Sequence, residues 1–303
     1  MVFMRLVCLY LIYPRFTLGR LLHSEGKIIG GVYAEEGAYP FAVSFQFDFG
    51  RHFCGGNVLT EKTVLSACHC ARLSREKRYF LFWRTETYAV AGSIDRTSKQ
   101  TQKRLVSQFL SHKKCDVKQY GWVYDYGLAV LKNPFNILKI QNNIRPIQIE
   151  NISLANDVQS MIRSRAVCRS MGWGSQVIVK PGAHYTGLSS VLKEVKINLM
   201  TYEACMELLC EPPKSRCVGD IEKRHQICGI GPDREDVCSG DSGSALVCNG
   251  KAVAITSWGP ACGEYRYPTM YSLLNVPFQW TSGGNSILVN FLALLLIIFS
   301  IKR

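Results

Sequence analysis

Residues 236–246 read Asp-Val-Cys-Ser-Gly-Asp-Ser-Gly-Ser-Ala-Leu, and no other stretch of the chain is as informative. At its centre Ser242 lies between Asp241 and Gly243. Glycine permits tight backbone turns that other residues adopt with difficulty. A serine beside glycine is most often an ordinary loop residue when it is taken alone. Its meaning therefore depends on what the rest of the chain supplies.

Two further motifs precede this stretch. Residues 66–70 read Ser-Ala-Cys-His-Cys and follow Phe-Cys-Gly-Gly at 53–56, and residues 124–131 read Tyr-Asp-Tyr-Gly-Leu-Ala-Val-Leu. A serine hydroxyl becomes a good nucleophile when a base removes its proton and a third group orients that base. The three motifs together supply candidates for all three roles, namely His69, Asp125 and Ser242.

Together these motifs resemble the trypsin/chymotrypsin family of serine proteases, in the family's chain order of His, Asp and Ser. The resemblance extends over about residues 28–280. It implies two antiparallel six-stranded β-barrels with the active site in the cleft between them. It also implies that Ser242 attacks the scissile carbonyl, that His69 is the general base and acid, and that Asp125 orients the imidazole. The backbone N–H groups of Gly240 and Ser242 would bind the oxyanion.

The pattern of the whole chain agrees with an all-β protein. Short β-type runs alternate with Gly, Pro, Asn and Asp, at residues 42–47, 63–66, 88–90, 128–131, 192–197 and 252–257. Many short strands of this kind are typical of sandwiches and barrels. The sequence has no sustained helical periodicity before its C-terminal tail, and it has no internal repeat.

The resemblance also implies a substrate pocket. Asp236 lies where trypsin-like members have an aspartate that pairs with a substrate Lys or Arg. The segment that binds the substrate backbone matches Ser257, Trp258 and Gly259. Thr269 departs from the family, which usually has glycine at this position. We expect Thr269 to make the pocket shallower and to disfavour Arg relative to Lys. Two further departures after the nucleophile, which we expect to be tolerated, are Ser244 and Ala245.

An activation junction is the next implication of the resemblance. Lys27 precedes Ile-Ile-Gly-Gly at residues 28–31. In the family, cleavage at this point frees an amine, here that of Ile28, which pairs with the aspartate beside the nucleophile, here Asp241. A buried ion pair does not tolerate the loss of one partner. We therefore expect the uncut chain to be an inactive zymogen. The plain alternative is a strand that ends in a turn.

The N-terminal end predicts secretion. Residues 1–19 hold an apolar run after Arg5 and resemble a secretory signal peptide, which would leave residues 20–27 as an activation propeptide. The peptidase domain would then be residues 28–281. The alternatives for the apolar run are a buried strand and a wrongly assigned start of the chain.

The C-terminal residues 282–303 form a hydrophobic tail that ends in Lys-Arg. We expect a membrane anchor or an anchor signal. The apolar run is shorter than the ~20 residues of a usual spanning helix. A glycolipid-anchor signal requires a polar spacer, and this chain has almost none. An ordinary buried helix is the third alternative, but a helix that is apolar all round fits it poorly.

The amino-acid composition indicates the cellular compartment. The chain has 303 residues, of which 47% are hydrophobic and 19% are charged, and this excludes a disordered protein. Thirteen cysteines favour an oxidising compartment, so we expect an extracellular protein of the secretory pathway, attached to the cell membrane. The net charge of +13 favours acidic partners. Without a Lys/Arg run or an aromatic-basic motif, the sequence does not indicate nucleic acid.

The resemblance implies four disulfides, which are Cys54–Cys70, Cys168–Cys248, Cys205–Cys228 and Cys238–Cys262. Cys8 lies in the expected signal peptide, and four cysteines remain open. Cys210 and Cys217 flank a Pro-rich insertion and could close a small loop, which leaves Cys68 for Cys115. The Cys-His-Cys run at 68–70 lacks the spacing of a structural zinc site, and we expect no metal or organic cofactor. Asn151 begins an Asn-Ile-Ser glycosylation sequon.

These features together predict a zymogen serine endopeptidase that hydrolyses protein or peptide substrates after Lys or Arg. Its partners would include an activating protease and protease inhibitors. Two other classes compete. A protease-like binding protein without activity would fit the departures at Ser244, Ala245 and Thr269. An esterase would need a different chain order of its catalytic residues.

Overall fold

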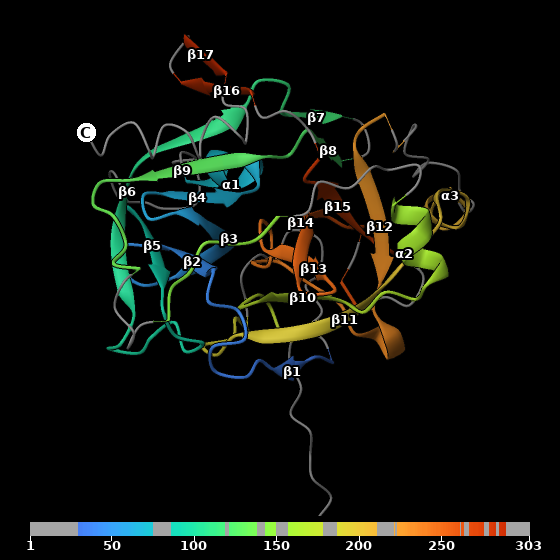
Figure 1. Cartoon of the computed structure of the whole chain (residues 1–303), viewed down its shortest axis with the longest axis horizontal. Helices are drawn as coiled ribbons and strands as arrows, with labels where there is room; N and C mark the ends of the chain where they lie inside the picture. The colour runs from blue at the N-terminus through green and yellow to red at the C-terminus, as the bar shows by residue number, and fades with distance from the viewer. Residues whose placement is uncertain are drawn as a thin grey trace, which may run out of the picture.

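The structure is a computed structural model of the whole chain (Figure 1). It describes residues 30–74, 86–118, 121–137, 143–149, 157–177, 187–210, 221, 223–260, 262–263, 267–275, 279–282 and 285–288. The expected signal peptide and propeptide lie outside the described residues, as do Lys27, Ile28, Asn151 and Cys217.

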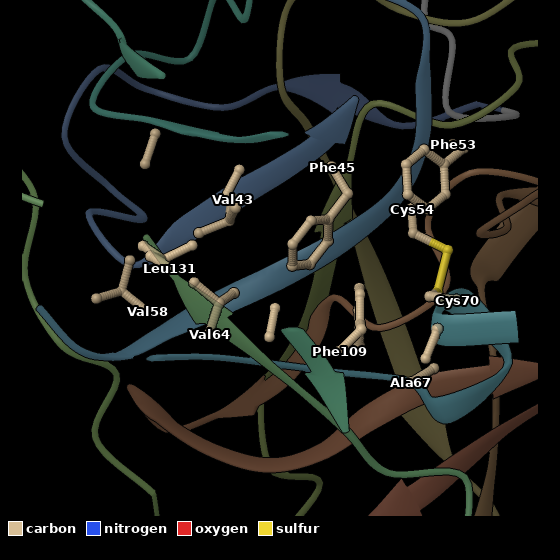
Figure 2. Close-up of a cluster of buried hydrophobic side chains, with 14 of the residues drawn as sticks. Val43, Phe45, Phe53, Cys54, Val58, Val64, Ala67, Cys70, Phe109 and Leu131 are labelled. Atoms are coloured by element: carbon tan, nitrogen blue, oxygen red, sulfur yellow. A yellow bond between two sulfur atoms is a disulfide. The ribbon is translucent and has the colours of Figure 1, made fainter. Parts of the chain in front are cut away.

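The first barrel closes six antiparallel strands around an apolar core. Their order is β6-β5-β2-β3-β4-β9, and β6 pairs with β9 to complete the circle. Phe45, Phe53 and Phe109 pack in the interior, next to the disulfide between Cys54 and Cys70 (Figure 2). The strands are β2 (Ala42–Phe47), β3 (His52–Thr60), β4 (Thr63–Ser66), β5 (Thr87–Ala91), β6 (Gln102–His112) and β9 (Gly127–Leu131).

Strand β2 is buried along its whole length. Successive side chains of a strand point to opposite faces, so a fully buried strand must satisfy its polar side chains on one of them. Val43 and Phe45 belong to the barrel core. On the other face Gln46 donates a hydrogen bond to Ser44, and Ser44 bonds the ring of His52. These polar contacts lie beside the candidate site.

The second barrel repeats this architecture. Its order is β11-β10-β13-β14-β15-β12, with β11 paired to β12 and the short strand β1 (Val32–Tyr33) added outside β11. Val195, Ile197 and Tyr271 pack in its core. The strands are β10 (Cys168–Gly172), β11 (Lys193–Leu199), β12 (Gln226–Ile230), β13 (Ala245–Cys248), β14 (Lys251–Trp258) and β15 (Thr269–Leu273).

The two barrels lie side by side (Figure 1). A third apolar cluster joins them, to which the first barrel contributes Leu65 and Leu128 and the second contributes Ala245 and Ile255. The predicted fold class, two antiparallel six-stranded β-barrels, is thereby confirmed. Five of the six segments that the sequence predicted as strands lie wholly within strands, and the sixth, 192–197, begins one residue before β11.

Short helices are the feature that the sequence pattern missed. The described part of the chain contains α1 (Cys68–Leu73), α2 (Gln159–Arg163), α3 (Tyr202–Leu209) and one 3-10 turn, η5 (Pro232–Arg234). Only α3 carries a local signal. The side chain of Thr201 caps it by accepting a hydrogen bond from the N–H of Ala204, and Glu203 lies in its first turn.

Two hairpins complete the described part. β7 (Asp116–Lys118) pairs with β8 (Gly121–Val123) close to α1, and β16 (Gln279–Ser282) pairs with β17 (Asn285–Leu288). β16 also pairs with the end of β6, so the expected boundary between peptidase domain and tail falls inside β16. Searched for membrane spans, the described residues contain no helix that is both long and apolar enough to cross a bilayer.

Candidate active site

His69 lies in the first turn of α1, directly after β4. The first N–H groups of a helix have no partner within the helix, and Ala67 at the N-cap supplies no side-chain cap. Asp125 fills this role. Its Oδ1 accepts from the backbone N–H of His69 at 3.0 Å, and its Oδ2 bonds the ring Nδ1 of His69 at 2.8 Å. One carboxylate thus fixes both the start of the helix and the plane of the imidazole.

Asp125 itself is completely buried and comes just before β9 in the first barrel. The hydroxyl of Ser257, from β14 in the second barrel, donates a third hydrogen bond to Oδ2 at 2.6 Å. The backbone N–H of His69 and the hydroxyl of Ser257 already donate to its two oxygens, and a carboxylate only accepts. The Nδ1 of His69 therefore carries the proton, which leaves Nε2 as a proton acceptor.

Ser242 lies on the loop that precedes β13. A Cβ atom on Gly243 would lie 2.2 Å from Ser66 Oγ and 2.8 Å from the backbone N of Ala67, so glycine is needed for this approach. The N–H of Gly55 donates to the carbonyl of Ser242 at 2.9 Å. The loop that carries Ser242 is thus held against the segment that leads into His69. No hydrogen bond joins the hydroxyl of Ser242 to the ring of His69, although both residues are described.

The backbone N–H groups of this loop alternate in their partners. Asp241 N donates to the carbonyl of Cys238 at 2.9 Å, and Gly243 N donates to the carbonyl of Thr256 at 2.8 Å. Within the described residues, the N–H groups of Gly240 and Ser242 have no acceptor. Buried backbone donors are nearly always paired. Two free donors at this point are what an oxyanion requires.

His52, which belongs to none of the three sequence motifs, holds the carbonyl of Gly240. Its Nε2 donates to that carbonyl at 2.9 Å, and its Nδ1 accepts from the hydroxyl of Ser44 at 2.8 Å. Burial, and secondarily the charge of Arg96, lowers the pKa of His52 to about 3, so the ring is neutral. The available signal was a pair of polar residues, Ser44 and Gln46, within a strand that is otherwise apolar.

Asp241 lies in a chamber made by two glycines. A Cβ atom on Gly172 or Gly174 would lie 2.0 Å or 2.4 Å from a carboxylate oxygen of Asp241. The N–H groups of Gly174 and Cys238 donate to this carboxylate at 2.7 Å and 2.8 Å. Burial nevertheless raises the pKa of Asp241 to about 7. No Lys, Arg or His among the described residues forms an ion pair with it.

Asp236 and Thr269 are in direct contact. The hydroxyl of Thr269 donates to Asp236 Oδ1 at 2.9 Å, and the N–H of Gly263 donates to Oδ2 at 3.1 Å. Burial raises the pKa of Asp236 to about 6. A Cβ atom on Gly259 would lie 3.5 Å from Thr269 Oγ1, so the threonine hydroxyl lies between the carboxylate and Gly259. Trp258, the residue before Gly259, covers the hairpin at β8.

Ser244 and Ala245 are accommodated by residues of β3. Gly55 makes the room, since a Cβ atom there would lie 1.9 Å from Ser244 Oγ. Asn57, also missed from sequence, accepts from the N–H of Ala245 at 3.1 Å and donates to the carbonyl of Gly243 at 2.8 Å. One asparagine side chain therefore holds the backbone on both sides of Ser244.

Five disulfides join described residues, and four of them are the pairs that the resemblance implies. The fifth joins Cys68 to Cys115 and ties α1 to the residue before β7. Cys210 is also disulfide-bonded. Since Cys68 and Cys70 are in disulfides, their sulfur atoms are not the thiolates that bind zinc.

The fold and the site define a two-barrel protein of the serine-protease type. The chain belongs to the trypsin family, because the family model described as Trypsin matches residues 28–281. It is 26% identical to trypsin theta of Drosophila melanogaster over 84% of this chain and 85% of the relative. It is 27% identical to hypodermin-A of Hypoderma lineatum over 84% of this chain and 86% of that one.

A solved structure supports the fold. Neuropsin, a serine protease expressed in the limbic system of mouse brain, superposes with a TM-score of 0.60. The likeness covers 81% of this chain and 94% of neuropsin at 22% sequence identity.

Proposed function

We propose that this chain is a serine endopeptidase that cleaves protein substrates after basic residues through an acyl-enzyme. The observation that carries this proposal is the buried Asp125 carboxylate, which bonds His69 Nδ1 at 2.8 Å and leaves Nε2 to act as a base beside the nucleophile loop. The mechanism is that of the family. Each step has a residue that can perform it.

In the first step Ser242 Oγ attacks the substrate carbonyl carbon while His69 Nε2 takes the hydroxyl proton. The carbonyl oxygen becomes an oxyanion that the N–H groups of Gly240 and Ser242 stabilise. His69 then delivers the proton to the leaving amine, and the acyl-enzyme forms as the peptide bond breaks. Water attacks this ester with His69 again as the base, and Ser242 regains its proton. Asp125 stabilises the imidazolium in both halves.

Asp236 would bind the basic side chain of the substrate. Its carboxylate is buried, and this burial raises its pKa. No described Lys, Arg or His forms an ion pair with it. Thr269 already donates to one of its oxygens. A compact Lys ammonium can share the remaining acceptor positions, whereas the guanidinium of Arg needs two adjacent ones in a plane. We therefore propose a preference for Lys over Arg.

We also propose that the uncut chain is a zymogen. Asp241 is buried, accepts only backbone donors and has a pKa raised to about 7. A carboxylate in this state gains most from an incoming ammonium, which the cleaved junction at Lys27 would supply from Ile28. Secretion, glycosylation at Asn151 and attachment through residues 282–303 complete the proposal, and they rest on the sequence alone.

A fluorophosphonate probe tests the activity directly, because labelling needs a nucleophile that its base has activated. We expect labelling of the chain cleaved at Lys27, and none of the Ser242→Ala or His69→Ala variants. A peptide library incubated with unlabelled, cleaved enzyme from the same preparation then reads the preference for the residue before the cut. A cleaved, folded chain that neither labels nor hydrolyses any library peptide contradicts the proposal and favours a protease-like binding protein.

A further inference from the structure

The chain takes an unusual path just before Asp125. Tyr124 has a φ of +47°, and the N–H of Tyr126 donates back to its carbonyl at 2.8 Å. A bulky residue in the left-handed region is a genuine outlier, and such conformations persist only where the surroundings hold them. Because Asp125 follows Tyr124 directly, whatever holds Tyr124 also sets the direction of the catalytic carboxylate.

Residues of the second barrel supply this hold. Gln226, at the start of β12, donates from Nε2 to the backbone carbonyl of Trp122 at 2.8 Å. Its side chain is 1% exposed. The neighbouring His225 places its ring 5.7 Å from the ring of Tyr124. On the first barrel, the ring of His112 stacks on Tyr124 at 5.3 Å with an interplanar angle of 6°.

We propose that His225 and Gln226 are positioning residues for Asp125, acting from the second barrel as a clamp on Trp122 and Tyr124. The strained backbone at Tyr124 cannot relax while its ring and the carbonyl of Trp122 are both held. Asp125 is thereby aimed at His69 in its own barrel and at Ser257 in the other. The effect of the clamp on rate rests on the proposed peptidase function.

The buried amide of Gln226 has no other described role. Since a carbonyl oxygen only accepts, the Gln226 amide must present Nε2 to Trp122, and Oε1 is then left buried without a described partner. An unpaired buried acceptor costs stability. The hydrogen bond to Trp122 is the contact that fixes this orientation of the side chain, and Trp122 lies three residues before the catalytic aspartate.

The test compares Gln226→Met with Gln102→Met. Both substitutions remove a buried amide that donates to a backbone carbonyl, at 2.8 Å to Trp122 and at 2.9 Å to Asn136. Gln102 lies on the first barrel and touches nothing at the site. Methionine keeps the length of the side chain. His225→Leu serves as a second variant, because its half-buried ring is easier to replace.

Two measurements are made on the chain cleaved at Lys27. For Gln226→Met we expect kcat to fall at least about 10-fold with little change in KM, since small misplacements of a catalytic group cost up to ~100-fold. The downfield proton resonance of His69 Nδ1–H should also shift or broaden. Gln102→Met should lower the melting temperature without changing either. If Gln226→Met and His225→Leu both keep the kcat of the wild-type chain and the His69 resonance does not move, the clamp is overturned.

The resonance does not depend on turnover. If the wild-type chain neither labels nor hydrolyses substrate, the proposed function fails, while a shift that Gln226→Met causes and Gln102→Met does not still supports the clamp.

Discussion

Replacing Thr269 by glycine should change the choice between Lys and Arg. The hydroxyl of Thr269 lies 2.9 Å from Asp236 Oδ1, and the Gly259 position lies on its other side. An arginine guanidinium must displace this hydroxyl to reach both carboxylate oxygens. A hydrogen bond to a charged group is worth about 1.5–3 kcal/mol. Filling a pocket with one extra small group costs bound substrate a similar amount. We expect the Arg:Lys ratio of kcat/KM to rise at least about 10-fold in Thr269→Gly.

Two smaller substitutions separate the methyl from the hydroxyl. Thr269→Ser keeps the hydroxyl and removes the methyl, whereas Thr269→Val keeps the shape and removes the donor. Because the Thr269 hydroxyl lowers the pKa of Asp236 against the effect of burial, its loss should raise that pKa further above about 6. The acidic limb of kcat/KM for Lys substrates should then move to higher pH in Thr269→Val and stay in place in Thr269→Ser.

The assay is a set of paired fluorogenic peptides that differ only in Lys or Arg before the cut, measured from pH 5 to 9. Circular dichroism and melting temperature confirm that each variant is folded. An unchanged Arg:Lys ratio in folded Thr269→Gly would refute our reasoning, because the threonine would then not limit the pocket.

Other consequences follow from the same contacts. Burial raises the pKa of Asp241 in the uncut chain to about 7, so the folded state keeps a proton that the unfolded state loses above about pH 4. This group alone should lower stability by about 4 kcal/mol from pH 4 through 7. Asp241→Asn in a Ser242→Ala background should remove that share of the pH slope in thermal melts and leave the smaller share of Asp236. His52→Ala frees the carbonyl of Gly240 and should lower kcat about 10-fold or more with a smaller change in KM, as measured by steady-state kinetics. Lys27→Gln should leave the chain unable to react with fluorophosphonate after exposure to trypsin. Labelling equal to that of the wild-type chain would show that the uncut chain is not an inactive zymogen. Replacing both Cys68 and Cys115 by alanine should lower stability by about 2–4 kcal/mol and raise KM more than it lowers kcat, because the bridge ties the β7–β8 hairpin to α1.

The strands were predictable because their signal is local. Residues 42–47 and 63–66 form strands with the predicted bounds, and the runs at 128–131 and 252–257 lie within β9 and β14. The helices were not predictable from the sequence pattern. Helix α1, for example, has only six residues and depends on a distant side chain. Its first turn is completed when Asp125 accepts from the N–H of His69. A helix that needs a tertiary contact to begin leaves no periodicity to read.

Polar residues inside buried strands were the part of the site that was harder to predict from the sequence. His52 and Asn57 lie on β3, and Gln226 begins β12. Each is nearly fully buried, and each bonds a backbone carbonyl that is more than 100 residues away in the chain. Nothing in their sequence neighbourhood identifies these partners. The motif residues could be singled out because the resemblance implies roles for them, whereas these supporting residues can be recognised only when the two barrels are placed together.

The three buried carboxylates of the candidate site differ in what they lack. Asp125 accepts from two donors on His69 and one on Ser257, so its charge is satisfied within the protein. Asp241 and Asp236 have backbone donors and one hydroxyl between them, and burial raises the pKa of both. A buried carboxylate without a cation is costly unless binding supplies one. The two that are unsatisfied are those to which the proposed function brings a cation, from the new N-terminus to Asp241 and from the substrate to Asp236. Asp125, whose charge is already satisfied, is the carboxylate that the proposed function requires to stay in place.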